Sequence, residues 1–433
     1  MNEPRGRSLC SIFVFVILLL QARPAWADAS APPESGQPPE SAPKAQAPSG
    51  ATVLQSRDGR DSLKLGMSVQ ADLRLPQSGS GLESTFLVRR ARLGLTGTLA
   101  SAVDARLIAD FGQGSTPIFQ DAWLDLRFTS WLRLRAGRLK VPVGYEWLET
   151  SSNYLDFVEQ SLVYSLLLPR YDNGVALHGE FADQRAEYWL GLFNEASGKV
   201  RDEDSGKMVA GRLAVSPVEG VSFAVSGTHA LGDNLPEEVR KTLPTGLAIL
   251  ADQDTLKYAG GTTGLYVVPP EWRLAAEAIS YLGPTSLKVE YSRLHSPARD
   301  GWLRASDVGE DDKRVQLPGL RSQAVYASGT VVLTGEKRTD KGVAPARPFD
   351  PAAGHLGAGA WELTARYGFA QLRFERGQTE QDVPAEQHIH ELTAGLNWYL
   401  NSSTRFMFNV SRYSFLRDKP PFHEVLMRVQ WTF

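Results

Sequence analysis

The chain has 433 residues, with 46 lysines and arginines against 49 aspartates and glutamates, for a formal charge of −3. This length allows two or three soluble domains or one large closed β structure. The acidic balance argues against a surface that is basic overall, so we expect no nucleic-acid partner. It leaves room for a locally basic pathway.

The N-terminus has the features of a secretory signal peptide. Arg5 and Arg7 precede an apolar run over 9–20, and Ala25-Trp26-Ala27 has the spacing of a cleavage site. We therefore expect residues 1–27 to be removed after Ala27, which leaves 43 basic and 48 acidic residues and a charge near −5. The one cysteine, Cys10, lies in this signal, so the mature chain must rely on packing or sheet closure.

Residues 28–57 are predicted to form a disordered periplasmic tether. The stretch 28–50 contains six prolines among Ala, Ser, Gln and Glu, and has no aliphatic side chain larger than alanine. Such a composition cannot bury enough surface to offset the entropy of ordering. No later stretch has 18 consecutive apolar residues, so no transmembrane helix is expected.

From Ser62 onward apolar and polar residues alternate, which predicts two-faced strands rather than helices. The last strand shows this well, because Val425, Met427, Val429, Trp431 and Phe433 form one apolar row. By itself this pattern fits either a soluble sandwich or a membrane barrel. The predicted strands are 62–75, 86–99, 102–111, 120–129, 131–140, 173–182, 185–194, 207–217, 220–230, 265–283, 285–295, 321–335, 359–376, 388–400, 404–416 and 422–433.

The lengths of the connections decide between these two folds. Tight turns join the strands in pairs, and longer polar connections separate the pairs, an arrangement typical of outer-membrane barrels. We therefore predict an all-β fold, a 16-stranded antiparallel transmembrane β-barrel over 58–433 whose last strand pairs with its first. The connection 336–358 breaks the pattern, because it is long on the short-turn side, and the sequence offers no reason for it.

The connection 141–172 carries aromatic and aliphatic residues that a solvated loop would not need, including Tyr145, Trp147 and Phe157. We expect this third extracellular loop to fold inward against the barrel wall and narrow the pore. Packing at a subunit interface or over the rim is the alternative.

Basic residues recur on the polar faces of the strands. In a barrel lumen, guanidinium groups there either guide anions or balance wall carboxylates such as Asp104 and Asp125. His388 and His390 share a strand face without a third metal ligand, so no metal or other cofactor is expected. The basic residues in question are Arg74, Arg90, Arg92, Arg106, Arg127, Arg133 and Arg135, with Arg138 and Lys140 beside the 141–172 loop.

Several motifs together resemble the phosphate-selective porins O and P over most of 62–433. They are Phe86-Leu-Val-Arg-Arg-Ala-Arg, Asp121-Ala-Trp-Leu, Gly137-Arg-Leu-Lys-Val-Pro-Val-Gly, Thr150-Ser-Ser, Glu159-Gln-Ser-Leu with Pro169-Arg170, Leu333-Thr-Gly-Glu, Gly359-Ala-Trp-Glu-Leu and Gly395-Leu-Asn-Trp-Tyr-Leu-Asn. The resemblance implies a homotrimeric outer-membrane channel of a Gram-negative bacterium, with a constricting third loop and basic residues that guide anions such as phosphate.

The resemblance also implies roles for particular residues. Arg89 and Arg90 match the family's basic pair, Asp121 its acidic partner, and Ser151 and Ser152 its anion-contacting hydroxyls. Phe433 resembles the terminal signal read by the outer-membrane assembly machinery. Two departures, Gln160 in place of an arginine and Leu148 in place of a lysine, remove positive charge from the constriction.

The expected function is a passive diffusion channel that favours small anions. The expected pathway residues are Arg89, Arg90, Arg92, Asp121, Arg127, Arg133, Arg135, Arg138, Lys140, Ser151 and Ser152. Three alternatives stay open, namely a porin with other or no selectivity, a plugged structural barrel, and an outer-membrane hydrolase whose catalytic groups only geometry would reveal.

Overall fold

The computed structural model describes residues 53–112, 118–195, 206–231, 237–238, 266–267, 270–303, 313–375, 386–415 and 420–433. The expected signal peptide and most of the expected tether lie outside these residues. Within them, no helix is long and apolar enough to cross a membrane. The structure is nearly all sheet, in agreement with the predicted fold class.

One sheet of seventeen strands dominates the described part of the chain, and sixteen of these strands form the barrel. The remaining strand, β1 (Val53–Gln55), pairs only with the start of β2, inside the segment expected to be tether. The barrel strands are β2 (Ser62–Pro76), β3 (Thr85–Leu99), β4 (Val103–Asp110), β5 (Ile118–Arg127), β6 (Arg133–Lys140), β7 (Tyr171–Phe181), β8 (Ala186–Phe193), β9 (Lys207–Val218), β10 (Val221–Leu231), β13 (Trp272–Leu282), β14 (Thr285–Ser296), β17 (Gly319–Val332), β22 (Ala360–Glu375), β23 (Glu386–Tyr399), β24 (Thr404–Phe415) and β25 (Phe422–Thr432).

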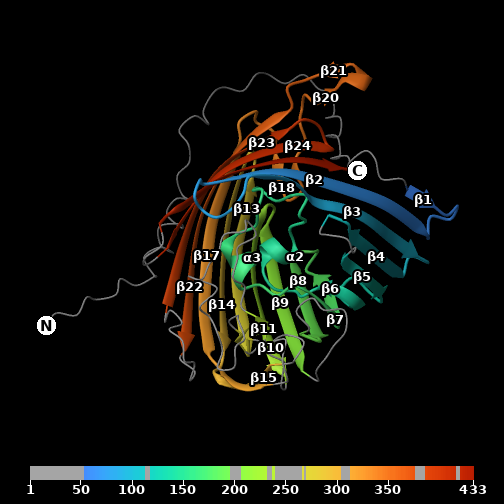
Figure 1. Ribbon diagram of the computed structural model, residues 1–433. Helices are drawn as coiled ribbons and strands as arrows, with labels where there is room; N and C mark the ends of the chain where they lie inside the picture. The colour runs from blue at the N-terminus through green and yellow to red at the C-terminus, as the bar shows by residue number, and fades with distance from the viewer. Residues whose placement is uncertain are drawn as a thin grey trace. The chain divides into compact units, whose positions relative to one another are not determined.

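The sheet closes on itself through β2 and β25, which pair antiparallel from Ser68 opposite Thr432 to Pro76 opposite Glu424 (Figure 1). The backbone N–H of Phe433 donates to the carbonyl oxygen of Met67 at 2.9 Å. Closure leaves no free edge among the barrel strands, which a sheet in lipid requires because nothing there can satisfy an exposed edge. The predicted pairing of the last strand with the first is confirmed.

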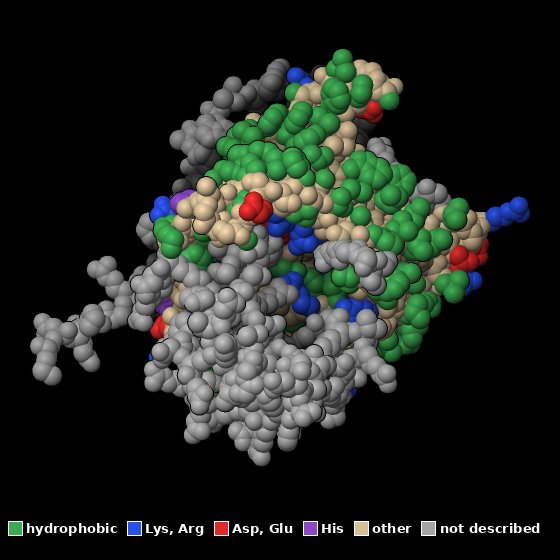
Figure 2. Space-filling model, in the orientation of Figure 1, with side chains coloured by type: hydrophobic (Ala, Val, Ile, Leu, Met, Phe, Trp, Pro, Cys, Tyr) green, Lys and Arg blue, Asp and Glu red, His purple; other side chains and the backbone are tan. Residues whose placement is uncertain are grey.

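Burial along the strands is reversed relative to a soluble protein. In β25, Arg428 is 2% exposed and Gln430 is 4% exposed, whereas their neighbours Val429 and Trp431 are 45% and 40% exposed. Figure 2 shows hydrophobic side chains over the outer faces of the strands at the top and right, and Lys and Arg side chains in the hollow beside them. An apolar exterior with a charged interior is the pattern of a transmembrane barrel.

One predicted strand boundary is wrong. The strand expected over 265–283 begins at Trp272, while Tyr266–Val267 forms a separate strand, β12, with β11 (Glu237–Glu238). Pro270 lies two residues before this start and has no N–H for the sheet ladder, so pairing of β13 with its neighbours begins after it.

The long connection 336–358 contains two small hairpins. One joins β18 (Arg338–Thr339) to β19 (Gly342–Val343), and the other joins β20 (Phe349–Asp350) to β21 (His355–Leu356) around a 3-10 turn over Pro351–Ala353. Val343 packs with Val332, Ala360 and Tyr399 at the ends of three barrel strands. The first hairpin therefore folds back onto the barrel, which gives part of this connection a structural role.

Two further strands and two short helices complete the described structure. The strands β15 (Arg299–Leu303) and β16 (Lys313–Leu317) pair with each other between β14 and β17. The short helices α2 (Tyr145–Leu148) and α3 (Leu162–Leu166) lie in the connection between β6 and β7, and Figure 1 shows them among the barrel strands.

Candidate solute pathway

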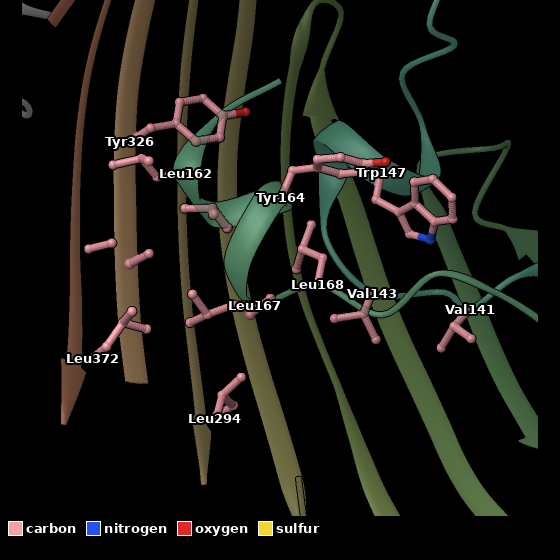
Figure 3. Packing of buried hydrophobic residues seen from close by; sticks show 14 of the residues in the cluster. Val141, Val143, Trp147, Leu162, Tyr164, Leu167, Leu168, Leu294, Tyr326 and Leu372 are labelled. Carbon is pink, nitrogen blue, oxygen red and sulfur yellow. The ribbon is translucent and has the colours of Figure 1, made fainter. Parts of the chain in front are cut away.

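The residues 141–170 between β6 and β7, here called the inner segment, pack against the buried face of the strands. Leu162 and Leu167 of the inner segment belong to one buried cluster with Leu294 of β14, Tyr326 of β17 and Leu372 of β22 (Figure 3). This packing accounts for the apolar residues that made the connection unusual in the sequence.

Local hydrogen bonds shape the two helices of the inner segment. Ser161 precedes α3 and its hydroxyl accepts from the backbone N–H of Tyr164 at 3.3 Å, a normal N-cap. The backbone N–H of Ser161 in turn donates to Glu146 Oε2 at 3.0 Å. Burial, opposed by Arg366 and Ser161, raises the pKa of Glu146 above its ordinary value.

Irregular backbone in the inner segment is satisfied by side chains from β22, β23 and β24. Arg405 donates to the carbonyl oxygens of Leu155 at 2.9 Å and Asn153 at 3.1 Å, and Asn397 donates to that of Asp156 at 2.9 Å. The N–H of Val158 donates to Asn409 Oδ1 at 2.6 Å. Buried backbone groups without such partners would each cost about 1–3 kcal/mol.

Two buried carboxylates fasten the inner segment to the strands and to the hairpin of connection 336–358. Asp156 pairs with Lys288 of β14 at 2.6 Å and with Arg338 of β18. Burial alone would raise the pKa of Asp156, but these two cations outweigh it and lower the pKa. The hairpin that the sequence could not explain thus contacts the inner segment directly.

Glu159 is the second anchor. It pairs with Arg89 of β3 at 3.1 Å and with Arg74 of β2, and Arg428 of β25 lies 3.8 Å away. Burial favours the neutral acid, but Arg89, Arg74 and Arg428 together lower the pKa of Glu159 to about 2. The carboxylate is therefore ionised at any physiological pH.

Arg89 and Arg90 both reach the interior, although neighbouring residues on a strand normally face opposite sides. A register shift in the β2–β3 pairing explains this, because Gln70 pairs with Arg90 and Ala71 with Val88, leaving Arg89 as the extra residue. Arg90 is 3% exposed and donates to Gln70 Oε1 at 2.7 Å. Both arginines are committed to internal contacts beside the inner segment.

A cavity of about 430 Å³ lies between the inner segment and the wall formed by β2 to β6 and β8. It contains six of the residues expected along the pathway, namely Arg92, Asp121, Arg135, Lys140, Ser151 and Ser152. Its other lining residues include Arg106, Gln120, Trp123, Leu139, Leu148, Glu149, Tyr171, Glu187, Trp189 and Phe433.

The basic residues of the cavity come from adjacent strands. Arg92 on β3 pairs with Asp110 at 2.8 Å and also contacts the Ser152 hydroxyl. Arg106 on β4 lies 3.4 Å from Asp121, and its side chain is 43% exposed. Lys140 at the end of β6 donates to the carbonyl oxygens of Trp147 at 2.6 Å and Leu148 at 3.2 Å.

Arg135 of β6 is fixed by aromatic rings as well as by charge. Its guanidinium carbon lies 3.9 Å from the ring centre of Trp123 and 4.9 Å from that of Trp189, and Nη2 lies 2.6 Å from Asp125. Cation–π contact and ion pairing together hold the guanidinium plane in place. It therefore presents a rigid edge to the cavity.

The remaining expected residues lie outside this cavity. Arg127 and Arg133 pair with Asp104, and Arg133 also pairs with Asp125 at 3.1 Å. Arg138 is placed by register opposite Ala122 and donates to the carbonyl oxygen of Phe119 at 2.9 Å. With Arg89 and Arg90 these side chains form five of the eleven expected pathway residues, and the structure gives them other neighbours.

Several residues of the cavity were not predicted from the sequence. Trp123 shares strand parity with Asp121, and Trp189 shares it with Glu187, so alternation contained a signal for both. Glu149 had no such signal, because it lies in the inner segment rather than on a strand. Burial, followed by the opposing effect of Arg212, raises the pKa of this carboxyl.

Within the described residues, no group of three or more His, Cys, Asp or Glu side chains is arranged to hold a metal ion. What the structure provides instead is a closed barrel with an apolar exterior, a charged interior and a polar cavity beside an internal segment. These features define an outer-membrane porin.

The family model of the phosphate-selective porins O and P matches residues 63–430, and the chain belongs to this family. No curated protein matches the chain. Among solved structures, it is similar to OmpT of Vibrio cholerae with loop L8 deleted (TM-score 0.55, 11% identity, covering 86% of this chain and 100% of that one). It is also similar to OmpT in its trimer form (0.52, 10%, 86% and 99%) and to the anion-selective porin of Comamonas acidovorans (0.51, 12%, 86% and 100%). At such identities these likenesses establish the fold alone.

Proposed function

We propose that the protein is a passive channel of the outer membrane that favours small anions, phosphate-like oxyanions among them. The observation that supports this most is the row of Arg92, Arg106 and Arg135 on one wall of the cavity, with Lys140 at its end. Guanidinium groups match the geometry of phosphate and carboxylate oxygens. Membership of a family described as phosphate-selective supports the same conclusion.

The inner segment is proposed to fold into the lumen as the pore constriction. Its contacts with β14, β17 and β22 to β24 occupy that side of the barrel, so the solute path runs through the cavity beside β2 to β6. Asp121, Glu149 and Glu187 line the same cavity and oppose the basic row. We infer that these carboxylates keep anion binding weak, which lets a bound ion leave.

Reversal potentials in planar bilayers under a salt gradient test this function. We expect the sign of the reversal potential to show preferential anion permeation. Added phosphate should reduce this preference, because it competes for the basic row. Preferential cation permeation would contradict the anion proposal and leave the porin intact. A silent bilayer would favour a plugged barrel, and turnover of ester or phospholipid substrates by the purified protein would favour a hydrolase.

The topology supports a proposed orientation with the short turns in the periplasm, where the tether would also lie. The first barrel strand begins on that side and the last barrel strand ends there, as in bacterial outer-membrane barrels. We further propose that the signal is cleaved after Ala27, and that the terminal Phe433 is read by the assembly machinery.

We propose a homotrimer whose interface is the wall of short strands. β4, β6 and β8 have 8 residues each, whereas β22 has 16. Eight tilted residues cover only about 20 Å, less than the roughly 25 Å apolar band of a membrane barrel. Leu124 on β5 is nevertheless 58% exposed, so a second copy would shield this wall.

Cysteine cross-linking would locate this interface. The mature chain is expected to contain no cysteine, so Leu124→Cys introduces a single thiol on the short wall. A flexible bismaleimide should then give covalent dimers in membranes, the largest product that one thiol per chain allows. Leu363→Cys on β22, which is 44% exposed, is the matched control on the tall wall and should remain monomeric. Equal cross-linking at both positions would contradict the proposed interface.

A further inference from the structure

A polar row crosses the outer face of the tall wall, at the barrel end that carries the long connections. Residues directly opposite each other on neighbouring antiparallel strands share a face. The register places the following residues side by side from β10 to β23: His229, Trp272, His295, Arg321, Arg373 and Glu386.

This polar row gives way to apolar residues within a short distance along the strands. Two residues further toward the barrel's middle, the register joins Leu274 to Arg293 and Arg293 to Gln323. Another two residues on, it joins Ala276 to Tyr291 and Tyr291 to Val325. A rapid change from basic to apolar residues on an outward face is expected where lipid headgroups meet acyl chains.

A cavity of about 250 Å³ lies at this boundary, lined by Trp272, Arg293, Leu294, His295 and Arg321. Arg293 and His295 are two residues apart on β14, so they lie on one face, and Arg321 of β17 is directly opposite His295. The Trp272 ring centre is 5.8 Å from that of His295 and 5.9 Å from the Arg293 guanidinium carbon. Strands β14 and β17 thus direct two guanidinium groups and an imidazole into one hollow, and β13 adds the Trp272 ring.

Carboxylates satisfy only part of this basic set. Arg321 Nε lies 2.6 Å from Glu375 Oε1, and His295 Nε2 lies 3.9 Å from Glu271 Oε2. The other ring nitrogen of His295 is buried without a hydrogen-bond partner in the described structure. No described carboxylate forms an ion pair with Arg293. The hollow therefore has donors available for an anion that offers several oxygens.

We infer that this hollow binds a phosphate group of a phosphorylated glycolipid in the outer leaflet of the membrane. The apolar surface directly beneath selects a lipid over a free anion. Leu274 is 57% exposed and Tyr291 is 37% exposed on the outer face, where acyl chains would cover them. Trp272 suits the same boundary, because its indole is apolar apart from one N–H group. The site lies outside the barrel, so it is separate from the solute pathway.

The test measures retention of bisphosphorylated lipid A by the full-length protein, using native mass spectrometry after purification in a mild detergent. Arg293→Ala with Arg321→Ala should weaken binding by roughly tenfold or more, because each removes a charge-assisted contact to phosphate. Arg293→Lys with Arg321→Lys should retain part of the affinity. Arg347→Ala, at an exposed arginine near the short turns, is the matched control and should bind like the unaltered protein.

A gain-of-binding variant keeps the proposal testable even if the double alanine variant fails to fold. Glu375→Gln removes the carboxylate that competes for Arg321, so its affinity for the lipid should rise. Equal retention by all variants, or equal binding of lipid A stripped of phosphate, would overturn the proposal. Displacement of the lipid by millimolar inorganic phosphate would show a free-anion site and also overturn it. Conductance should be the same in all of these variants as in the unaltered protein, because the site lies outside the solute pathway. Failure of the lipid proposal is therefore distinguishable from failure of the proposed channel function.

Discussion

Arg106→Glu is expected to shift the channel from anion preference toward cation preference. Arg106 is the most exposed ion-paired arginine of the basic row, and the substitution would place a second carboxylate beside Asp121. Reversing one charge about 4 Å from a passing ion changes the energy of that ion by about 2 kcal/mol even at the dielectric constant of bulk water. That energy corresponds to a change of roughly tenfold or more in the anion-to-cation permeability ratio.

Asp121→Asn should produce the opposite shift, because it frees Arg106 from its partner and removes one negative charge. Arg138→Glu is the matched control for Arg106→Glu, since this arginine was expected on the pathway but lies outside the cavity lining. Reversal potentials for the three variants provide the measurement. An equal shift for Arg138→Glu and Arg106→Glu would mean that overall charge, and not the cavity, sets the selectivity.

Glu159→Gln is expected to release the inner segment from the wall of β2, β3 and β25. The side chain of Glu159 is 3% exposed and is shared by arginines from all three strands. Removing one partner of a buried ion pair costs about 3–5 kcal/mol, because the remaining charges stay buried. The sheet ladder does not depend on Glu159, so the barrel should stay closed while single-channel conductance becomes larger and noisier.

Glu219→Gln provides the matched control for this anchor. Glu219 pairs with Lys337, but its side chain is 90% exposed, and surface pairs of this kind contribute little. Conductance and the thermal transition of the folded barrel should both match the unaltered protein. If Glu159→Gln also left both unchanged, Glu159 would not be an anchor of the constriction.

Acid should act on the same anchor as Glu159→Gln. The pKa of Glu159 falls from the ordinary 4.5 to about 2 in the folded protein, mainly through Arg89, Arg74 and Arg428 against the effect of burial. A lowered pKa stabilises the fold above pH 4.5, and this contribution is lost as the pH falls toward 2. We therefore expect open, noisy channels to appear between pH 4.5 and 2. Glu159→Gln should lack the part of this transition that Glu159 causes.

Most of the fold follows from the sequence, because strand alternation has a period of two and needs no tertiary information. The sixteen predicted strands match the barrel strands within a few residues, apart from the start of β13, where Pro270 intervenes. Alternating connection lengths distinguished the membrane barrel from a sandwich. The apolar residues of 141–170 correctly indicated that this connection packs against other parts of the chain.

The candidate site was less predictable, and Arg89 and Arg90 show why. Alternation assigns them to opposite faces, but the one-residue shift between β2 and β3 brings both inside. Such a shift depends on how two strands pair, and the sequence of β3 alone does not contain it. The same holds for Arg338, whose partner Asp156 is 182 positions away in the chain.

The sequence alone therefore determined the class of fold, the number of strands, the pairing of the last strand with the first and the set of inward-facing residue types. These depend on local periodicity and on the lengths of connections. Only the tertiary structure decided which basic residues line the cavity and which hold the inner segment. That division depends on which carboxylate each guanidinium reaches, and packing places those carboxylates on distant parts of the chain.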